Sequence, residues 1–279
     1  MKKSFLILLV AMSSFTLFAN GQSETVKEEV INYTFGGSST VAPIAKSVIP
    51  EFEKENTSVK IGYETLGSST GIKQLLAGTL TLAGSSRDLK QSELDSGCVP
   101  TIIALDGLSV GVNSSVSISN LSLAQLAAIF SGEITNWSEV GGDDLKIELI
   151  ERDETSGTYG SFNEIVLESQ GKEPTKKAII AKENGEVATK IASTPGSIGY
   201  IGMAFNHIIT NAGGKILTID GVEPSSENVI NKTYPISRAL YVVTIGEPKD
   251  NTVEKDFIDF LLSKKGQAIV EESEFISVN

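Results

Sequence analysis

Short apolar runs alternate along most of the chain with longer stretches in which apolar residues recur at helical spacing. A short apolar run bounded by turn residues predicts a β-strand, and apolar residues recurring every three or four positions predict a helix. The predicted strands are residues 31–35, 59–64, 80–84, 102–113, 146–150, 197–202 and 235–246. The predicted helices are residues 41–56, 71–78, 89–95, 158–169, 185–194 and 253–272. Strands that alternate with helices indicate an α/β fold.

Local signals refine two of the helical segments. Pro43 fits the first turn of the helix at 41–56, where its missing N–H is not needed. Pro50 lies late in the same segment, so we expect a kink there. Ser122, with Gln125 three residues on, forms a capping-box pattern that predicts the start of another helix.

The turns that follow four of the apolar runs share one composition, rich in hydroxyl side chains and glycine. They are GGSST (36–40), LGSST (66–70), AGSSRD (83–88) and ETSGT (154–158). In open α/β sheets, ligands bind outside the carboxyl ends of strands, where such turns lie. A single serine in one such turn is most simply a helix N-cap. Four turns of one type favour a shared function, an anion held by N–H and O–H donors.

The last of these turns also carries a cation. Arg152 precedes the Ser156-Gly157-Thr158 trio by four residues, and a helical pattern follows. A guanidinium fork, two hydroxyls and the N–H groups of a helix start are the parts of an anion site. The same residues also fit a solvated loop with an ordinary N-cap, and this stretch alone leaves both interpretations open.

The N-terminal segment has the pattern of a secretory signal peptide, which we place at residues 1–20. Lys2 and Lys3 precede an apolar run, and small residues follow at the expected cleavage position. An uncleaved membrane anchor fits less well because the run is short for a bilayer. Cys98 is the only cysteine, so no intramolecular disulfide and no lipid anchor near residue 20 are expected. We therefore expect a periplasmic protein.

Length and charge narrow the classes of partner. The chain has 279 residues and a formal net charge of −12. Without the signal peptide, about 258 residues and a charge of about −14 remain, enough for one large core or two medium ones. This excess of acidic residues argues against nucleic acid as a binding partner. It does not exclude an anionic ligand, because net charge is screened within about 8 Å in salt, whereas a desolvated site is governed by the dipoles that touch it.

The usual parts of a hydrolase are missing. His207 is the only histidine, and it lies in an apolar context without a G-x-S-x-G nucleophile motif in the chain. No P-loop motif is present. One histidine and one cysteine also make no transition-metal site. We predict binding without turnover, with no metal and no cofactor.

Several motifs in order resemble the phosphate-binding proteins of ABC-type phosphate importers, over essentially the full length after the signal peptide. They are FGGSSTVAPIA, YETLGSSTGIKQLLAGT, AGSSRDL, IFSGEITNW, ERDETSGTYGSF and TPGSIGYIG. The resemblance implies a type II periplasmic binding fold, in which two α/β lobes joined by a two-stranded hinge hold the ligand between them. Lobe one would comprise residues 28–107 and 239–279, and lobe two residues 108–238.

The resemblance also implies a set of phosphate ligands. Carried over by motif, they are Ser39, the Thr40 N–H, Ser68, Arg152, Ser156, the Gly157 N–H and Thr158. Arg152 would form a charge-assisted fork to two phosphate oxygens, with Asp153 or Glu154 holding its guanidinium.

One position departs from the family pattern. Well-known relatives place an aspartate in the third turn to accept the proton that phosphate carries, and here Arg87 stands there, followed by Asp88. Arg87 would add a donor, so the acceptor must come from elsewhere. Asp106 is the first candidate and Asp88 the second; Asp106 could also be a hinge or turn carboxylate. A carboxylate would reject sulfate, which has no proton to donate.

The sequence thus predicts an exported, monomeric receptor that binds inorganic phosphate and delivers it to the permease of an ABC transporter, without nucleic-acid partners. A receptor for another tetrahedral oxyanion is the alternative within this class. A secreted phosphate-ester hydrolase is the alternative from another class. A structural surface protein would leave the aligned hydroxyl turns unexplained.

Overall fold

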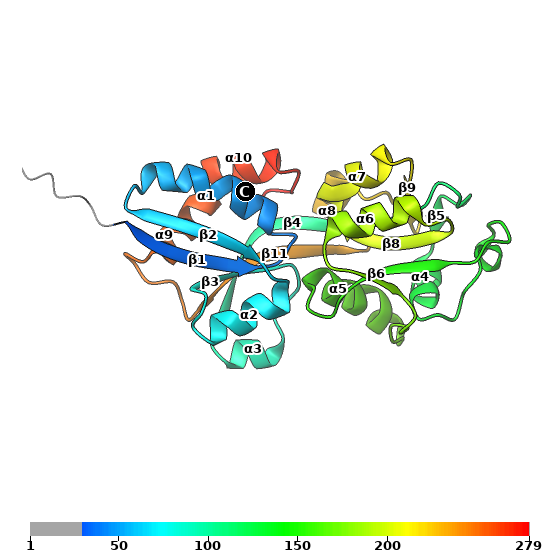
Figure 1. Cartoon of the computed structure of the whole chain (residues 1–279), viewed down its shortest axis with the longest axis horizontal. Helices are drawn as coiled ribbons and strands as arrows, with labels where there is room; N and C mark the ends of the chain where they lie inside the picture. Colours follow the sequence, from blue (N-terminus) through cyan, green and yellow to red (C-terminus); the bar gives the residue numbers. More distant parts are fainter. Residues whose placement is uncertain (1–29, 279) are drawn as a thin grey trace, which may run out of the picture.

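The computed structural model describes residues 30–278, so the predicted signal peptide lies outside the described residues. Two α/β lobes lie side by side in an elongated molecule, and strands β4 (Cys98–Val112) and β11 (Ser237–Ile245) lie between them (Figure 1). The strand order is β2 (Val59–Thr65), β1 (Ile31–Gly37), β3 (Leu82–Ser85), β11, β4, β8 (Ser197–Gly202), β6 (Glu148–Arg152) and β7 (Ile179–Ala181), and β9 (Lys215–Ile216) pairs with β4. Among residues 30–278, none of the helices combines the length and apolarity needed to cross a bilayer.

The first lobe is built on parallel strands, β1 beside both β2 and β3, with β11 antiparallel to β3. The strands are β1 (Ile31–Gly37), β2 (Val59–Thr65) and β3 (Leu82–Ser85). The helices are α1 (Ala42–Glu55), α2 (Ser68–Leu76), α3 (Gln91–Asp95), α9 (Val253–Leu262) and α10 (Lys264–Glu272). These elements confirm the strands and helices predicted for this part of the chain. Helix α1 continues through Pro50, and the expected kink stays a prediction.

The second lobe repeats the arrangement, with β6 parallel to both β7 and β8 and β4 antiparallel to β8. Its strands are β5 (Asn120–Leu121), β6 (Glu148–Arg152), β7 (Ile179–Ala181), β8 (Ser197–Gly202), β9 (Lys215–Ile216) and β10 (Thr218–Ile219). Its helices are α4 (Leu123–Phe130), α5 (Gly157–Phe162), α6 (Asn184–Ser193), α7 (Asn206–Asn211) and α8 (Ser226–Ile230). The predicted capping box is confirmed, because Ser122 and Gln125 exchange hydrogen bonds at the start of α4.

Each lobe has its own aromatic core. In the first lobe, the Phe257 ring meets Phe35 and Phe52 edge-on, with centroids 5.2 and 5.4 Å apart. In the second lobe, Phe162 stacks on Tyr200 with centroids 3.8 Å apart. Separate cores allow the lobes to act as two rigid bodies.

Strand β4 links the two sheets. Its residues 98–107 pair with β11, and its residues 108–112 pair with β8. The strand changes its partner after Gly107. One continuous strand therefore places the carboxyl ends of both parallel sheets toward the region between the lobes.

Candidate functional site

The hydroxyl-rich turns meet where the lobes meet. The first three leave β1, β2 and β3, which are parallel, so these turns lie at one edge of the first sheet. The fourth leaves β6 in the second lobe and faces them. The backbone N–H of Ser69 donates to the carbonyl of Thr155 (3.1 Å), and the Ser161 hydroxyl donates to the carbonyl of Ser86 (2.9 Å). The two lobes are thus in direct polar contact.

In the first turn, Ser38 organises the backbone and leaves the next two side chains for other contacts. Its hydroxyl accepts the N–H groups of Thr40 (3.1 Å) and Val41 (3.2 Å), as an N-cap hydroxyl does. The Thr40 hydroxyl is fully buried and lies 3.1 Å from the Thr158 hydroxyl of the other lobe. The Asn184 amide, at the start of α6, also donates to it (3.1 Å).

The second and third turns are joined to each other. The Ser68 hydroxyl accepts the Ser86 N–H at 3.1 Å, and both side chains are buried. Gly157 faces them from the other lobe. A Cβ at Gly157 would lie 2.2 Å from the Ser68 hydroxyl and 2.6 Å from the Ser86 hydroxyl. Only glycine lets the two lobes approach this closely here.

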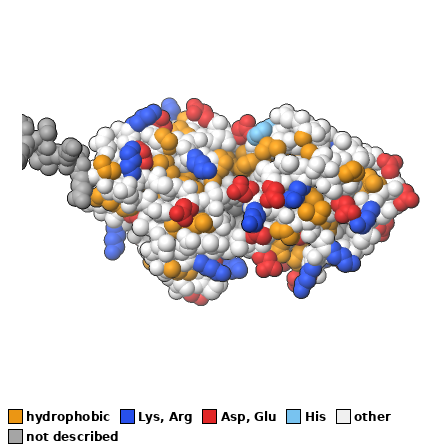
Figure 2. Space-filling model, in the orientation of Figure 1, with side chains coloured by type: hydrophobic (Ala, Val, Ile, Leu, Met, Phe, Trp, Pro, Cys, Tyr) orange, Lys and Arg blue, Asp and Glu red, His pale blue; other side chains and the backbone are white. Residues whose placement is uncertain are grey.

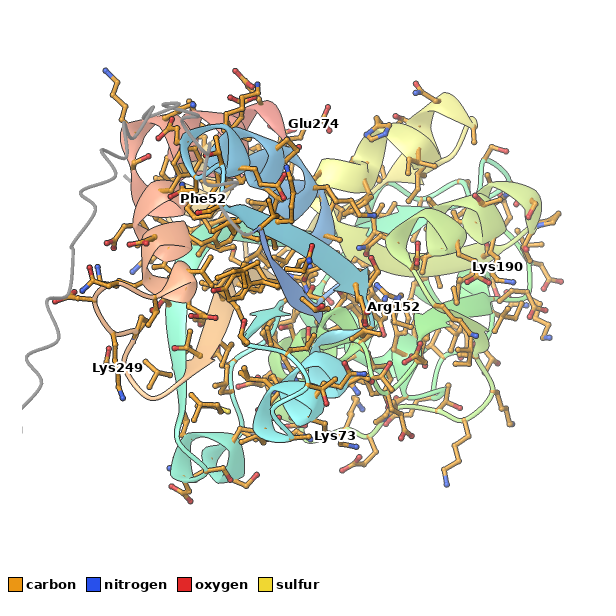
Figure 3. The ribbon with its side chains drawn as sticks, turned by 60° about the vertical axis from the view of Figure 1, so that its left-hand side comes forward. Phe52, Lys73, Arg152, Lys190, Lys249 and Glu274 are labelled. Atoms are coloured by element: carbon orange, nitrogen blue, oxygen red, sulfur yellow. The ribbon has the colours of Figure 1, made fainter. Side chains whose placement is uncertain are left out.

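Arg152 ends β6 and lies between the lobes, as Figure 3 shows. It is 1% exposed, and its Nη2 donates to the Ser39 hydroxyl across the cleft at 3.0 Å. The same nitrogen donates to the Lys182 carbonyl, and Nη1 donates to Asn184 Oδ1 at 3.4 Å. Its Nε is buried without a hydrogen-bond partner in the described structure. Burial lowers the pKa of Arg152 to about 10.

Asp153 and Glu154 form no hydrogen bond with this guanidinium in the described structure, although the charge of Asp153 raises the pKa of Arg152 against the effect of burial. The Asp153 carboxylate instead accepts from the N–H (2.8 Å) and the hydroxyl of Thr155, and so closes the turn. Glu154 is exposed. An acidic residue next to an arginine has a competing use, because short acidic side chains bond readily to the backbone two residues on.

The Ser156-Gly157-Thr158 trio forms a helix N-cap and also lies in the polar cluster, so it combines the two interpretations that the sequence left open. The Ser156 hydroxyl accepts the N–H groups of Thr158 (3.1 Å) and Tyr159 (3.3 Å), so it is the N-cap of α5. The Gly157 N–H occupies the first helical position, where no intrahelical acceptor exists. Thr158 is 1% exposed and directs its hydroxyl toward Thr40. Capping therefore aims these donors at the interlobe region.

Arg238, which the sequence analysis missed, belongs to the same cluster. It lies in β11 directly opposite Asp106 of β4, and it is 7% exposed. Its Nη1 donates to the Thr158 hydroxyl (2.9 Å) and the Ser86 carbonyl (3.0 Å), and its Nη2 lies 3.5 Å from the Thr40 hydroxyl. One feature of the sequence could have identified Arg238 as a site residue, namely its charge within the apolar run at residues 235–246. Asn184 and Ser86 were missed as well, because neither stands out from a cap or turn residue.

Asp106 is buried and held on both sides. Its Oδ2 accepts from Arg238 Nε (3.0 Å) and Nη2 (2.7 Å), and its Oδ1 accepts the Met203 N–H (3.1 Å). Burial raises the pKa of Asp106, while the Arg238 guanidinium opposes that rise. Ionised, the carboxylate neutralises one of the two buried guanidinium groups in the cluster.

Arg87 and Asp88 have other partners. The Arg87 guanidinium forms a two-pronged ion pair with Glu93, Nη1 to Oε2 at 2.9 Å and Nη2 to Oε1 at 2.7 Å. It also reaches the Ser69 hydroxyl at 3.3 Å. Asp88 is exposed and accepts the Tyr241 hydroxyl at 2.6 Å. The structure therefore brings together every other predicted site residue but gives Arg87 no hydrogen bond to the cluster.

The chemistry of the cluster is that of an oxyanion site. Two guanidinium groups, several hydroxyls and an amide converge, with one carboxylate among them. Within residues 30–278, no group of histidine, cysteine and acidic side chains could hold a metal ion. His207 is exposed, and its Nδ1 lies 3.4 Å from Oε2 of Glu274. Acidic and basic side chains intermingle on the outer face in Figure 2, whereas the guanidinium groups of Arg152 and Arg238 are buried between the lobes.

Comparison with known proteins gives one consistent result. The family model described as a PBP superfamily domain matches residues 22–265. The phosphate-binding protein PstS of Borreliella burgdorferi is 37% identical, with the alignment covering 100% of this chain and 99% of that protein. PstS of Bacillus subtilis is 32% identical, with 100% and 95% covered.

Solved structures agree. A phosphate ABC transporter substrate-binding protein from Clostridium perfringens, solved with bound phosphate, is 33% identical with a TM-score of 0.80, covering 89% of this chain and 100% of that one. An ABC-type phosphate transport receptor from Vibrio cholerae is 28% identical with a TM-score of 0.73, covering 88% and 99%. The two-lobed type II fold expected from the sequence is confirmed by these neighbours.

Proposed function

Because this chain belongs to the PBP superfamily, and within it to the phosphate-binding proteins of ABC transporters, we propose that it binds inorganic phosphate outside the cytoplasm for import. Proteins of this family are substrate-binding components of transporters and not enzymes. The observation that carries the proposal is the buried contact of Arg152 and Arg238 with hydroxyls of both lobes.

The donors suit a tetrahedral oxyanion. A guanidinium presents several N–H donors in a planar fork that matches two oxygens of a phosphate. Arg152 would provide that fork from the second lobe, and Arg238 a second one from the first lobe. The proposed hydroxyl and N–H donors are Ser39, Thr40, Ser68, Ser156, Gly157 and Thr158. Arg87, paired with Glu93, would support the third turn rather than add a direct donor.

Asp106 is the proposed acceptor of the phosphate proton. Its carboxylate lies in the buried cluster beside Arg238 and the Thr40 and Thr158 hydroxyls, and it accepts from Arg238 and from the backbone N–H groups of Met203 and Gly107. As the acceptor of the phosphate proton it would exchange one of these bonds for the bond to the ligand. Asp88, the other candidate, is exposed and bonded to Tyr241, so it is the weaker one. Sulfate would meet this carboxylate acceptor to acceptor, which is costly in a desolvated site.

Closure of two lobes over the ligand is part of the proposal. The lobes would be residues 28–107 with 239–279, and residues 108–238, hinged at β4 and β11. The exchange of β4 partners after Gly107 supports the first boundary. Because the donors come from both lobes, the lobes must close for all of them to contact the ligand, so closure is coupled to binding.

Finer features of the transport role belong to the same proposal. The chain would be exported with residues 1–20 removed, without a lipid anchor, since Cys98 is its only cysteine and is buried. It would act as a monomer and deliver phosphate to the permease subunits of the transporter.

Calorimetric titration of the processed protein tests the function. We expect one phosphate per chain, weaker binding of sulfate, and neither binding nor conversion of a phosphate monoester. Tighter binding of sulfate would identify a receptor for another oxyanion. Release of phosphate from the monoester would identify a hydrolase.

A further inference from the structure

Glu151 is a buried acid that the proposed phosphate site does not use. It is the next-to-last residue of β6, directly before Arg152, and only 2% of it is exposed. Its Oε1 is buried and has no hydrogen-bond partner among residues 30–278. A buried carboxylate without a cation or donor is costly, so the group must be neutral or must serve a purpose that offsets this cost.

The neighbours of Glu151 give it no counter-charge. The pairing of Ile150 with Gly199 places Glu151 beside Tyr200 on the same face of the sheet. Tyr200 is fully buried, and its hydroxyl is also without a partner in the described structure. The ring of Tyr200 stacks on Phe162, so the wall behind Glu151 is apolar.

Other charged groups surround Glu151 at the cavity beside it. A cavity of about 570 Å³ is lined by Glu151, by Tyr159 of α5, and by Glu173 and Lys176 from the segment before β7. Arg152, Asp153 and Glu154 line it from the same strand and the turn that follows. None of these groups forms an ion pair with Glu151. The cavity gives protons a route to the carboxyl.

Protonation of the Glu151 carboxyl removes the energetic cost of burying a charge. Burial raises the pKa of Glu151 to about 8, so the carboxyl is neutral at neutral pH and ionises only in mildly alkaline solution. Side chains at successive strand positions point to opposite faces. Glu151 and the Arg152 guanidinium therefore lie on opposite sides of β6, with one strand between the carboxyl and the proposed phosphate position.

We propose that Glu151 is a proton-linked residue of the phosphate site, neutral when phosphate is bound, whose ionisation in alkaline solution weakens phosphate binding. The inference rests on the proposed function. An ionised Glu151 would place a negative charge behind the wall of a site that must hold a phosphate anion. Across one strand of protein, repulsion of this kind weakens binding by about tenfold.

The linkage is reciprocal. If ionised Glu151 weakens phosphate binding, bound phosphate must make Glu151 harder to ionise by the same factor. Near pH 8.5, which lies just above the pKa of Glu151, the protein would then take up protons as phosphate binds. Glutamine at this position would keep the shape and abolish the linkage.

The test is phosphate calorimetry from pH 6 to 9.5 on the wild type and on Glu151→Gln, with Glu154→Gln as the matched control. Glu154 is an exposed acid of the turn that follows β6, so Glu154→Gln removes one negative charge that is already in contact with solvent. We expect wild type and Glu151→Gln to bind equally at pH 6. At pH 9.5 the wild type should bind about tenfold more weakly than Glu151→Gln, and Glu154→Gln should follow the wild type.

Parallel pH profiles of wild type and Glu151→Gln would overturn the inference while leaving phosphate binding intact. Failure of the wild type to bind phosphate at any pH would instead overturn the proposed function, and the inference with it. Carbon NMR of glutamate-labelled wild type provides a second measurement that does not depend on the variant. One carboxyl should titrate far above the others, and phosphate should move its midpoint upward; an unmoved midpoint would contradict the linkage.

Discussion

Arg238 and Asp106 lie directly opposite each other on β11 and β4, and the guanidinium donates to one carboxylate oxygen from Nε at 3.0 Å and from Nη2 at 2.7 Å. This leaves Nη1 for the Thr158 hydroxyl of the other lobe. Asp106 thus sets the orientation of an arginine that reaches across the cleft. The pair joins the strands between the lobes to the proposed anion site.

Replacing only one partner of this pair should destabilise the protein strongly. Arg238→Met leaves the Asp106 carboxylate buried and unpaired, which typically costs about 3–5 kcal/mol. Replacing both, with Asp106→Leu and Arg238→Met, should recover most of that loss, because an apolar pair of similar volume needs no ionic partner. Urea denaturation measures the stability and calorimetry the phosphate affinity. We expect stability to return in the double variant and affinity to stay low; recovery of affinity would show that Arg238 does not bind phosphate.

Arg152→Lys should harm phosphate binding nearly as much as Arg152→Ala. Lysine keeps the charge but loses the planar fork, so the exchange is not conservative at a two-pronged site. We expect each variant to lose about 1.5–3 kcal/mol of binding free energy, measured by calorimetry. Lys176→Ala is the control, because Lys176 is an exposed cation of the same lobe. Wild-type affinity in Arg152→Lys would show that Arg152 acts only as a distant charge.

Local patterns predicted most of the fold and most of the cluster. The order of strands and helices followed from apolar spacing, and the hydroxyl turns were found because each lies next to its own strand and helix in the sequence. The capping box at Ser122 and the N-cap at Ser156 are likewise contacts within a few residues. Such contacts can be read from spacing because their partners are near in the chain.

Long-range partners could not be read in this way. Arg238 contacts Asp106 from 132 positions away, and the apolar run around it predicted only a strand. Arg87 stands in an anion-site motif, yet Glu93, six residues on, takes its guanidinium. Asp153 follows Arg152 but bonds to Thr155. In each case the partner of the side chain depends on which of several possible hydrogen bonds has the better geometry in the fold. The spacing of residues along the sequence does not determine that geometry.

Gly157→Ala should prevent full closure of the lobes. The added methyl group would lie 2.2 Å from the Ser68 hydroxyl, a contact that only movement of the turns can relieve. Small-angle scattering with saturating phosphate should therefore show less compaction than in the wild type, with weaker binding. Gly62→Ala is the matched control, because nothing lies within 4 Å of a Cβ there. Equal compaction in Gly157→Ala and wild type would contradict closure through this contact.

The stability of the protein should fall as pH rises through the range in which Glu151 holds its proton. The pKa of Glu151 is about 8 in the folded protein and 4.5 without burial, so between these values the folded state binds the proton more tightly than the unfolded chain. The contribution is complete below pH 4.5 and is lost by about pH 8, at about 1.4 kcal/mol per pH unit from this group. Glu151→Gln should therefore gain stability relative to wild type with rising pH, as urea denaturation at pH 5, 7 and 8.5 would measure. A constant difference would show that Glu151 is ionised in the folded protein.

Asp106→Asn should change the preference for phosphate over sulfate. The asparagine amide can donate, so it removes the acceptor for the phosphate proton and relieves the clash with sulfate. It also weakens the hold on Arg238, which lowers the affinity for both anions, so the ratio of the two affinities is the quantity to measure by calorimetry. We expect that ratio to fall in Asp106→Asn and to stay unchanged in Asp88→Asn, since Asp88 is exposed and bonded to Tyr241. A ratio that falls only in Asp88→Asn would assign the acceptor to Asp88. A ratio unmoved in both would leave Asp106 the role of orienting Arg238, with selectivity set by the donors alone.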